Sequence, residues 1–200
     1  MMGARMMSRR IIAFYSPYPG AGKSTAGRWA ARRMGAREIS FAIPLRNAVV
    51  DMIMYPVYSP YPLFFSTEDK EKVIPHLGVT WREMMIAFGQ AGRQLHPDLW
   101  VRMLERRLKA ESVDFVVTDL RFPNEYDLMR RFGARIVRIE NPGREIVTRE
   151  TEGLLEGRRF DAVISNLKKS LKAYCYALDE MLGAFWPDLM EEKWQRQRKG

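Results

Sequence analysis

The chain alternates between short apolar runs and longer segments in which apolar residues recur every three or four positions. Short runs bounded by turn residues are typical of buried strands, and the longer periodic segments are typical of amphipathic helices. We expect strands at residues 10–16, 38–42, 113–118, 134–140 and 160–165. Helices are expected at 24–34, for about ten residues from Pro44, at 98–109, at 124–132, and from the last strand through 182.

The clearest predicted helix begins at Thr80, because Thr80 and Glu83 have the spacing of a capping box. Apolar side chains then fall on one helical stripe, made of Trp81, Met84, Met85, Phe88, Gly92 and Leu95. We interpret Trp81, Met84, Met85 and Phe88 as core because of this spacing. Residues 55–65 differ, because prolines among aromatic side chains exclude a regular helix. We expect an ordered loop or flap there.

Strands that alternate with helices favour a mostly parallel sheet with helices on both faces. The pattern therefore predicts an α/β fold of three layers, built on a five-stranded sheet. We find no internal repeat and no low-complexity linker, so a single domain over residues 1–200 is expected.

Composition restricts the classes of protein to which the chain can belong. Hydrophobic residues make up 46%, which suffices for a core. No apolar run approaches the roughly 18 residues of a membrane span, and the run after the first ten residues is too short for a secretion signal. Cys175 is the single cysteine, and His76 and His96 have no ligand-spaced partner. These features exclude an internal disulfide, disfavour a metal site of His and Cys, and fit a cytoplasmic protein.

The net charge of +9 lies mostly at the two ends of the chain. The first ten residues carry three arginines, the last eight carry four basic residues, and the remainder carries +2. A nucleic-acid-binding protein is expected to carry its basic residues as a stripe on the folded body. The distribution therefore favours solvated basic ends over a nucleic-acid partner, and the remaining arginines suit a small anionic substrate.

A glycine-rich segment lies between the first predicted strand and the next helix. It reads Pro17-Tyr18-Pro19-Gly20-Ala21-Gly22-Lys23-Ser24-Thr25. Its end matches the P-loop pattern G-x-x-x-x-G-K-[ST], with Pro17 in place of the leading glycine. The glycines let backbone N–H groups turn toward phosphates, the lysine reaches them as a charge, and the serine offers a hydroxyl to Mg²⁺. The strand before and the helix after favour ATP binding by Gly20, Ala21, Gly22, Lys23, Ser24 and Thr25 over a turn without a ligand.

Further segments resemble the bacteriophage deoxynucleoside monophosphate kinases, which are relatives of the cellular nucleotide kinases. In the family's order they are Phe41-Ala42-Ile43-Pro44-Leu45-Arg46, Thr80-Trp81-Arg82-Glu83 through Phe88-Gly89-Gln90-Ala91-Gly92-Arg93, Pro97-Asp98-Leu99-Trp100, and Val117-Thr118-Asp119-Leu120-Arg121-Phe122-Pro123-Asn124-Glu125. A weaker match runs from Thr151-Glu152 to Asp161-Ala162-Val163-Ile164-Ser165-Asn166. Two positions depart from the family: Pro17, and Arg149, where the family often has histidine.

The resemblance implies a P-loop NTPase fold and transfer of the γ-phosphoryl group of Mg-ATP to a deoxynucleoside monophosphate, which gives the diphosphate. The acceptor phosphate has a second pKa of about 6, so it is already anionic at neutral pH and needs no general base. Catalysis then consists of positioning and charge neutralisation. Lys23, Asp119 and Arg121 are the expected catalytic residues. Asp119, with Ser24, is placed to hold Mg²⁺, because it lies at a strand's carboxyl end.

Each of these residues also has a structural interpretation. Asp119 could cap a turn, and Arg121 could pair with Glu125. Asn124 and Glu125 have the character of the first turn of the next helix.

The helical region at about 44–110 is the expected acceptor site. Arg93 follows two glycines that let a ligand approach closely, and Gln90 is a candidate for contact with the base. Arg46 and Trp100 are further candidates, the latter for stacking on a base. Each could instead be solvated or packed, and Arg82 is expected on the surface or in an ion pair.

Residues at about 141–159 are polar and contain three glycines, in the place where nucleotide kinases carry a lid. Arg144 and Arg149 are the lid arginines on this interpretation, and a plain surface loop is the alternative.

Two other functions stay open from the sequence. One is another small P-loop kinase, such as a kinase of dephospho-coenzyme A, and the other is a nucleotide-dependent nucleic-acid-binding module that uses the basic ends. The sequence does not specify the accepted base or the sugar, and relatives of this kind can be homodimers.

Overall fold

The computed structural model describes residues 9–54, 67–141, 153–166 and 170–189. The chain divides into two compact units. One is made of the residues up to Ser40 together with those from Ala110 onward, and the other is Phe41–Lys109. The second unit therefore has nearly the bounds of the helical region expected at about 44–110.

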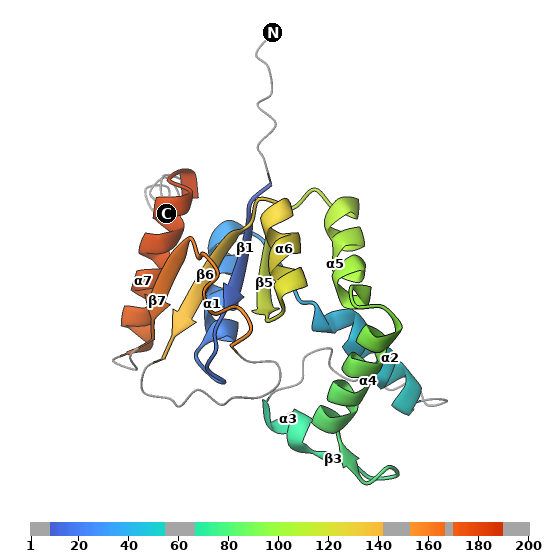
Figure 1. Cartoon of the computed structure of the whole chain (residues 1–200). Coiled ribbons are helices and arrows are strands. Elements are labelled where there is room, and N and C mark those ends of the chain that lie inside the picture. The colour runs from blue at the N-terminus through green and yellow to red at the C-terminus, as the bar shows by residue number, and fades with distance from the viewer. Residues whose placement is uncertain (1–8, 55–66, 142–152, 167–169, 190–200) are drawn as a thin grey trace. The chain divides into compact units, whose positions relative to one another are not determined.

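The first unit is built on a sheet of five strands, all parallel (Figure 1). The strands are β1 (Ile11–Tyr15), β2 (Arg37–Ile39), β5 (Phe115–Leu120), β6 (Arg135–Glu140) and β7 (Ala162–Ser165), in the order β2-β5-β1-β6-β7. All five residues of β1 are buried, as expected for a central parallel strand that is covered on both faces. The predicted five-stranded parallel sheet is confirmed.

Helices cover both faces of this sheet, which confirms the predicted three layers. α1 (Lys23–Met34) and α7 (Leu171–Phe185) share a core with alternate residues of β1, among them Ile12 and Phe14. Tyr15 points to the opposite face, on which α6 (Pro123–Arg131) lies (Figure 1). Cys175 of α7 is buried, as expected. No helix in the described part of the chain has the length and apolar character that crossing a membrane requires.

The second unit contains four helices and a short hairpin among its described residues. These elements are α2 (Ala42–Met54), α3 (Thr67–Glu71), β3 (Val73–Ile74), β4 (Val79–Thr80), α4 (Trp81–Leu95) and α5 (Leu99–Ala110). Their core gathers Leu45, Val49, Ile53, Ile74 and Trp81. The predicted capping box is confirmed, because Thr80 N–H donates to Glu83 Oε2 at 2.7 Å and Glu83 N–H donates to Thr80 Oγ1 at 3.2 Å.

Some expectations are wrong in detail. The strand expected at 38–42 ends at Ile39, and Ala42 already belongs to α2. Pro44 lies inside the first turn of α2, where the N–H that proline lacks would have no helical partner. Leu95 is 83% exposed, because it is the last residue of α4 and extends beyond the core. The segment expected as a flap, 55–65, lies outside the described residues.

α1 approaches β5 closely through Gly27. A Cβ at Gly27 would lie 2.1 Å from Thr118 Cγ2, which is too close for two carbon atoms that are not bonded to each other. Gly27→Ala should therefore lower the free energy of unfolding by about 1–3 kcal/mol, the usual effect of overpacking. Urea denaturation measures this, with Arg32→Ala on the exposed side of α1 as the control. Adding Thr118→Ser removes the opposing methyl group and should restore part of the loss. An unchanged midpoint for Gly27→Ala would show that the close approach imposes no constraint.

Candidate active site

The glycine-rich segment of residues 17–25, which we call the phosphate loop, lies at the same edge of the sheet as Asp119. β1 and β5 are neighbours, but the connection from β1 leads past β5 to β2, whereas the connection from β5 leads past β1 to β6. In open parallel sheets, ligands bind beyond the carboxyl ends of two strands whose connections diverge in this way. The phosphate loop follows β1 at this point, and Asp119 is the penultimate residue of β5.

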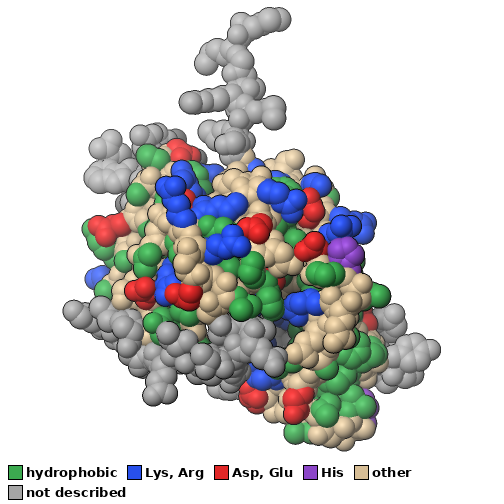
Figure 2. Space-filling model, viewed as in Figure 1, with side chains coloured by type: hydrophobic (Ala, Val, Ile, Leu, Met, Phe, Trp, Pro, Cys, Tyr) green, Lys and Arg blue, Asp and Glu red, His purple; other side chains and the backbone are tan. Residues whose placement is uncertain are grey.

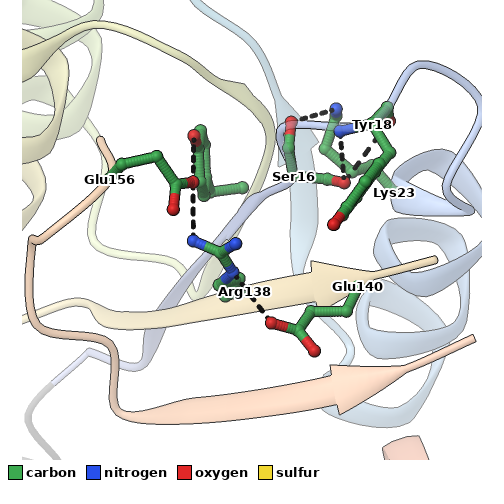
Figure 3. Close-up of polar contacts among 7 residues, drawn as sticks. Ser16, Tyr18, Lys23, Arg138, Glu140 and Glu156 are labelled. Atoms are coloured by element: carbon green, nitrogen blue, oxygen red, sulfur yellow. Dashed lines mark hydrogen bonds and ion pairs between the residues drawn. The ribbon is translucent and has the colours of Figure 1, made fainter. Parts of the chain in front are cut away.

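Ser16 closes the entrance of the loop around Pro17. Its Oγ accepts the Tyr18 N–H at 3.1 Å and lies 3.3 Å from the Tyr18 carbonyl oxygen (Figure 3). This is a serine turn, in which the hydroxyl bonds the backbone two residues further on. The central residue of such a turn needs no N–H of its own, so proline fits where the P-loop pattern has glycine.

The amino end of α1 is arranged as an anion site. Gly22 is the N-cap with φ of 102°, a left-handed conformation that favours glycine, and no described side chain caps the helix. The first turn contains no acidic residue, so the N–H groups and the helix dipole present positive charge there. Lys23 Nζ donates to the Ser16 carbonyl at 3.2 Å, which holds the ammonium group across the loop (Figure 3). Ser24 is exposed at the same end.

Asp119 lies in an irregular part of β5. The pairing of β1 with β5 shifts between Ala13, opposite Val117, and Tyr15, opposite Leu120, so that β5 uses one extra residue. Bulges of this kind re-aim side chains and are frequent beside active sites. The irregularity therefore falls on Thr118 and Asp119, at the carboxyl end of the strand.

Glu125 organises the turn that follows β5. This buried carboxylate, 5% exposed, accepts the N–H groups of Arg121 and Phe122 through Oε2, at 2.8 Å and 3.1 Å. It thereby satisfies orphan donors at the start of α6, which confirms that Glu125 belongs to a helix start. The Arg121 guanidinium is only half-buried, and its backbone is held in place by this turn.

The four expected acceptor residues lie in the second unit. Arg46 is in α2, Gln90 and Arg93 are in α4, and Trp100 is in α5. Gln90 is exposed and the Arg93 and Arg46 side chains are partly buried. Arg82, as expected, forms an ion pair, with Glu71. The stacking role of Trp100 stays a prediction, because its contacts are those of a packing residue.

Trp100 fixes the corner between α4 and α5. Its Nε1–H donates to the Gly89 carbonyl at 3.1 Å, and its ring lies on Gly92, where a Cβ would approach it to 2.5 Å. Gly92, which the sequence suggested as space for a ligand, thus makes room for this indole, whereas Gly89 faces the side chains of Arg93 and Leu45.

A cluster that sequence reasoning missed flanks the phosphate loop. Tyr15, the last residue of β1, donates to Glu156 Oε1 at 3.3 Å, and Arg138 of β6 pairs with Glu156 at 2.6 Å and with Glu140 at 3.2 Å (Figure 3). Burial, and secondarily the Glu156 carboxylate, raises the pKa of Tyr15 to about 12. The hydroxyl therefore stays a donor at neutral pH and ties residues 153–157 to the sheet.

The predicted lid is described only at its margins. Arg144 and Arg149 lie outside the described residues. Toward the end of the range, Leu155 is fully buried, Phe160 stacks on Tyr15 with ring centroids 5.4 Å apart, and Tyr126 donates to the Arg159 carbonyl. Residues 153–160 are therefore packed against other parts of the first unit, to which they belong.

Ion pairs neutralise much of the positive charge of the first unit. Its paired arginines include Arg10, Arg33, Arg130, Arg138 and Arg158, each with a carboxylate within 3.2 Å. On the face drawn in Figure 2, basic and acidic side chains of the described residues are accordingly interspersed.

Asp161 makes the acid stability of this unit testable. Burial opposes its ionisation, but the Ile136 N–H, at 2.7 Å, and the Arg130 guanidinium outweigh burial and lower the pKa of Asp161 below its ordinary 3.8. A lowered pKa contributes stability above pH 4 that is lost as the pH falls through the folded-state value. Asp161→Asn should be less stable at pH 7 and lose less on acidification, as measured by urea unfolding from pH 7 to 3. Asp127→Asn, an exposed carboxylate, is the control, and parallel pH profiles for Asp161→Asn and the native chain would contradict the assignment.

Two comparisons place the chain among known proteins, although no protein-family model matches it. Over 141 residues it is 29% identical to a protein of Acanthamoeba polyphaga mimivirus named "putative deoxynucleotide monophosphate kinase". This alignment covers 62% of the chain and 70% of the relative. Over 101 residues it is 39% identical to deoxynucleoside-5'-monophosphate kinase of Escherichia phage T5, which covers 48% of the chain and 40% of that relative. The resemblance carried by the motifs is confirmed: the chain is similar to two viral proteins that are named as deoxynucleoside monophosphate kinases.

Proposed function

We propose that the chain transfers the γ-phosphoryl group of Mg-ATP to a deoxynucleoside monophosphate and so forms a deoxynucleoside diphosphate. The observation that carries this proposal is the uncapped amino end of α1 behind a Gly20–Gly22 turn, beside Asp119 of β5. The names of the two viral relatives support it. The reaction would take place in the cytoplasm, which is that of the host cell if a phage encodes the chain.

The phosphates of ATP fit the positive end of α1. Several N–H groups of the first helical turn, the helix dipole and the Lys23 ammonium converge there, and each favours negative charge. Phosphoryl transfer needs little covalent help from the protein, so that neutralising crowded phosphates is the main catalytic task. Lys23 and Arg121 are the proposed neutralising side chains on the side of the first unit.

The residues present fit Mg²⁺ that is carried by a nucleotide. Mg²⁺ in such sites keeps several waters and takes one or two protein oxygen ligands together with the phosphates. Ser24 is exposed on α1, and Asp119 lies at the end of β5, the neighbouring strand. The described residues hold no cluster of three or more His, Cys, Asp or Glu that would form a metal site by itself. When bound, Mg²⁺ would withdraw charge from the transferring group; Ser24 and Asp119 would hold it there.

The acceptor is proposed to bind to the second unit. Arg93 and Arg46 are the candidates for binding its phosphate, because one guanidinium group can donate two parallel hydrogen bonds to two phosphate oxygens. Gln90, exposed one turn before Arg93, is the candidate for the base edge. No general base is required among these residues, since the acceptor phosphate is ionised at neutral pH.

The kinase proposal is tested by coupled ADP release with Mg-ATP against dGMP, dTMP, dCMP and dAMP. We expect turnover with at least one acceptor, and a decrease of about a hundredfold or more for Lys23→Ala and Asp119→Asn, the scale of losing one transition-state contact. Lys109→Ala, at an exposed surface pair with Glu105, is the matched control and should retain native turnover. Silence on all four acceptors from folded protein that binds ATP would refute the proposal and direct the assay to dephospho-coenzyme A.

Two variants on α4 test whether Arg93 binds the phosphate of the acceptor. Arg93→Ala should raise KM for the deoxynucleoside monophosphate about tenfold and leave KM for ATP near the native value, because one charge-assisted contact is worth roughly 1.5 kcal/mol or more. Arg82→Ala removes another arginine of α4, one that pairs with Glu71 of α3, and should leave both constants unchanged. Steady-state kinetics decide between them, and the opposite ranking of the two variants would remove Arg93 from the site.

A further inference from the structure

Two side chains from the end of β7 and from α7 hold successive carbonyl groups of the phosphate loop. Asn166 Nδ2 donates to the Ala21 carbonyl at 2.9 Å, and the Tyr174 hydroxyl donates to the Gly22 carbonyl at 3.3 Å. Neither residue was among the expected site residues. The contacts span 145 and 152 positions of the chain, so they are a tertiary feature of the loop.

Holding these carbonyls also orients the N–H groups that matter for a phosphate. A trans peptide is planar, and its C=O and N–H point in opposite directions. The Ala21 carbonyl shares its peptide with the Gly22 N–H, and the Gly22 carbonyl shares its peptide with the Lys23 N–H. Drawing the Ala21 carbonyl toward Asn166 therefore turns the Gly22 N–H to the side away from Asn166. The Gly22 carbonyl also accepts the Ala26 N–H at 2.9 Å, the first hydrogen bond of α1, so the Tyr174 hydroxyl reinforces an orientation of the Lys23 N–H that the helix begins.

The contact is close enough to leave little freedom. A Cβ at Gly22 would lie 2.7 Å from Asn166 Nδ2 and 3.3 Å from the Tyr174 ring and hydroxyl. Gly22 also has φ of 102°, so a side chain there is excluded by backbone conformation as well as by space. The glycine before the lysine thus serves the side chains behind the loop in addition to any ligand in front of it.

Both supporting side chains are themselves fixed. The Asn166 N–H donates to the Glu140 carbonyl at 2.7 Å, which continues the pairing of β7 with β6. Tyr174 is buried in the core with Ile12, Phe14 and Ala21, and its burial raises the pKa of its hydroxyl far above the physiological range. A hydroxyl that stays protonated is a permanent donor, so the orientation of the loop does not depend on pH near neutrality.

We propose that Asn166 and Tyr174 are positioning residues that orient the Gly22 and Lys23 N–H groups toward the phosphates of the bound nucleotide. This inference rests on the proposed function only in taking the ligand to be a nucleoside triphosphate. Preorganised N–H groups bind charge without paying for reorganisation when the ligand arrives. Loss of either side chain should therefore weaken the binding of polyphosphate while the fold remains.

Calorimetric titration with Mg-ATP and with inorganic tripolyphosphate tests the proposal directly. The variants are Tyr174→Phe, which removes only the hydroxyl, Asn166→Leu, which keeps the branched shape without the donor, and the double variant. We expect each single variant to bind both ligands about three- to tenfold more weakly, as for one hydrogen bond, and the double variant more weakly still. Tyr176→Phe changes a tyrosine of the same helix that is 64% exposed, and should bind as the native chain does.

Kinetics separate positioning from a general loss of structure. kcat/KM for ATP should decrease in Tyr174→Phe and Asn166→Leu, whereas KM for the deoxynucleoside monophosphate should stay at the native value. Native affinity and kcat/KM in folded Tyr174→Phe and Asn166→Leu would overturn the proposal, and so would an equal rise in both KM values. Tyr174→Phe alone decides the question if the double variant fails to fold.

The same titrations distinguish this inference from the proposed function. A native chain that binds tripolyphosphate but phosphorylates no acceptor would refute the kinase, while the affinities of the variants would still confirm or refute positioning. A native chain that binds neither ligand would overturn the positioning role, because there would be no phosphate site to orient.

Discussion

The parallel pairing of β1 with β5 determines where the main parts of the candidate site lie. Because both strands run in the same direction, the loop after β1 and the carboxylate at the end of β5 leave the same edge of the sheet. Burial stabilises this pairing. Ile12, Val116 and Val117 are fully buried, and the removal of apolar surface from water is the main stabilising contribution in a core. α1 can lie directly on the pair because Gly27 presents no side chain to Thr118.

Uncharged hydrogen-bonding groups hold the phosphate loop in its conformation. Ser16 shapes the entrance, Asn166 and Tyr174 hold the carbonyls, and the first turn of α1 presents its N–H groups without an acidic competitor. Among the described charged groups nearby, Arg138 pairs with both Glu140 and Glu156. Fixed dipoles together with the Lys23 ammonium group suit a ligand that arrives with several negative charges and leaves with fewer.

The sequence predicted best those features that local patterns encode. The strand–loop–helix around Gly22-Lys23-Ser24 and the capping box at Thr80 depend on residues a few positions apart, so periodicity and motif spacing were sufficient. The hairpin of β3 and β4 was missed, because two-residue strands have no period to detect. Asn166 and Tyr174 were missed for another reason. A lone asparagine and a tyrosine on an apolar helix have no local signature, and their partners lie some 150 residues away. The packing of Trp100 on Gly92 was equally invisible, since glycine spacing alone does not say which group fills the space.

The long separation of these contacts has a consequence for synthesis of the chain. The phosphate loop leaves the ribosome early, but β5 pairs with β1 only after the whole second unit has been made, and Tyr174 follows about 150 residues behind Gly22. Contacts between such distant residues are the slowest to form in folding. A chain that ends before α7 therefore carries the glycine-rich loop without Tyr174, which holds one of its carbonyl groups. A ligand that binds only the completed fold would stabilise finished molecules over partial ones.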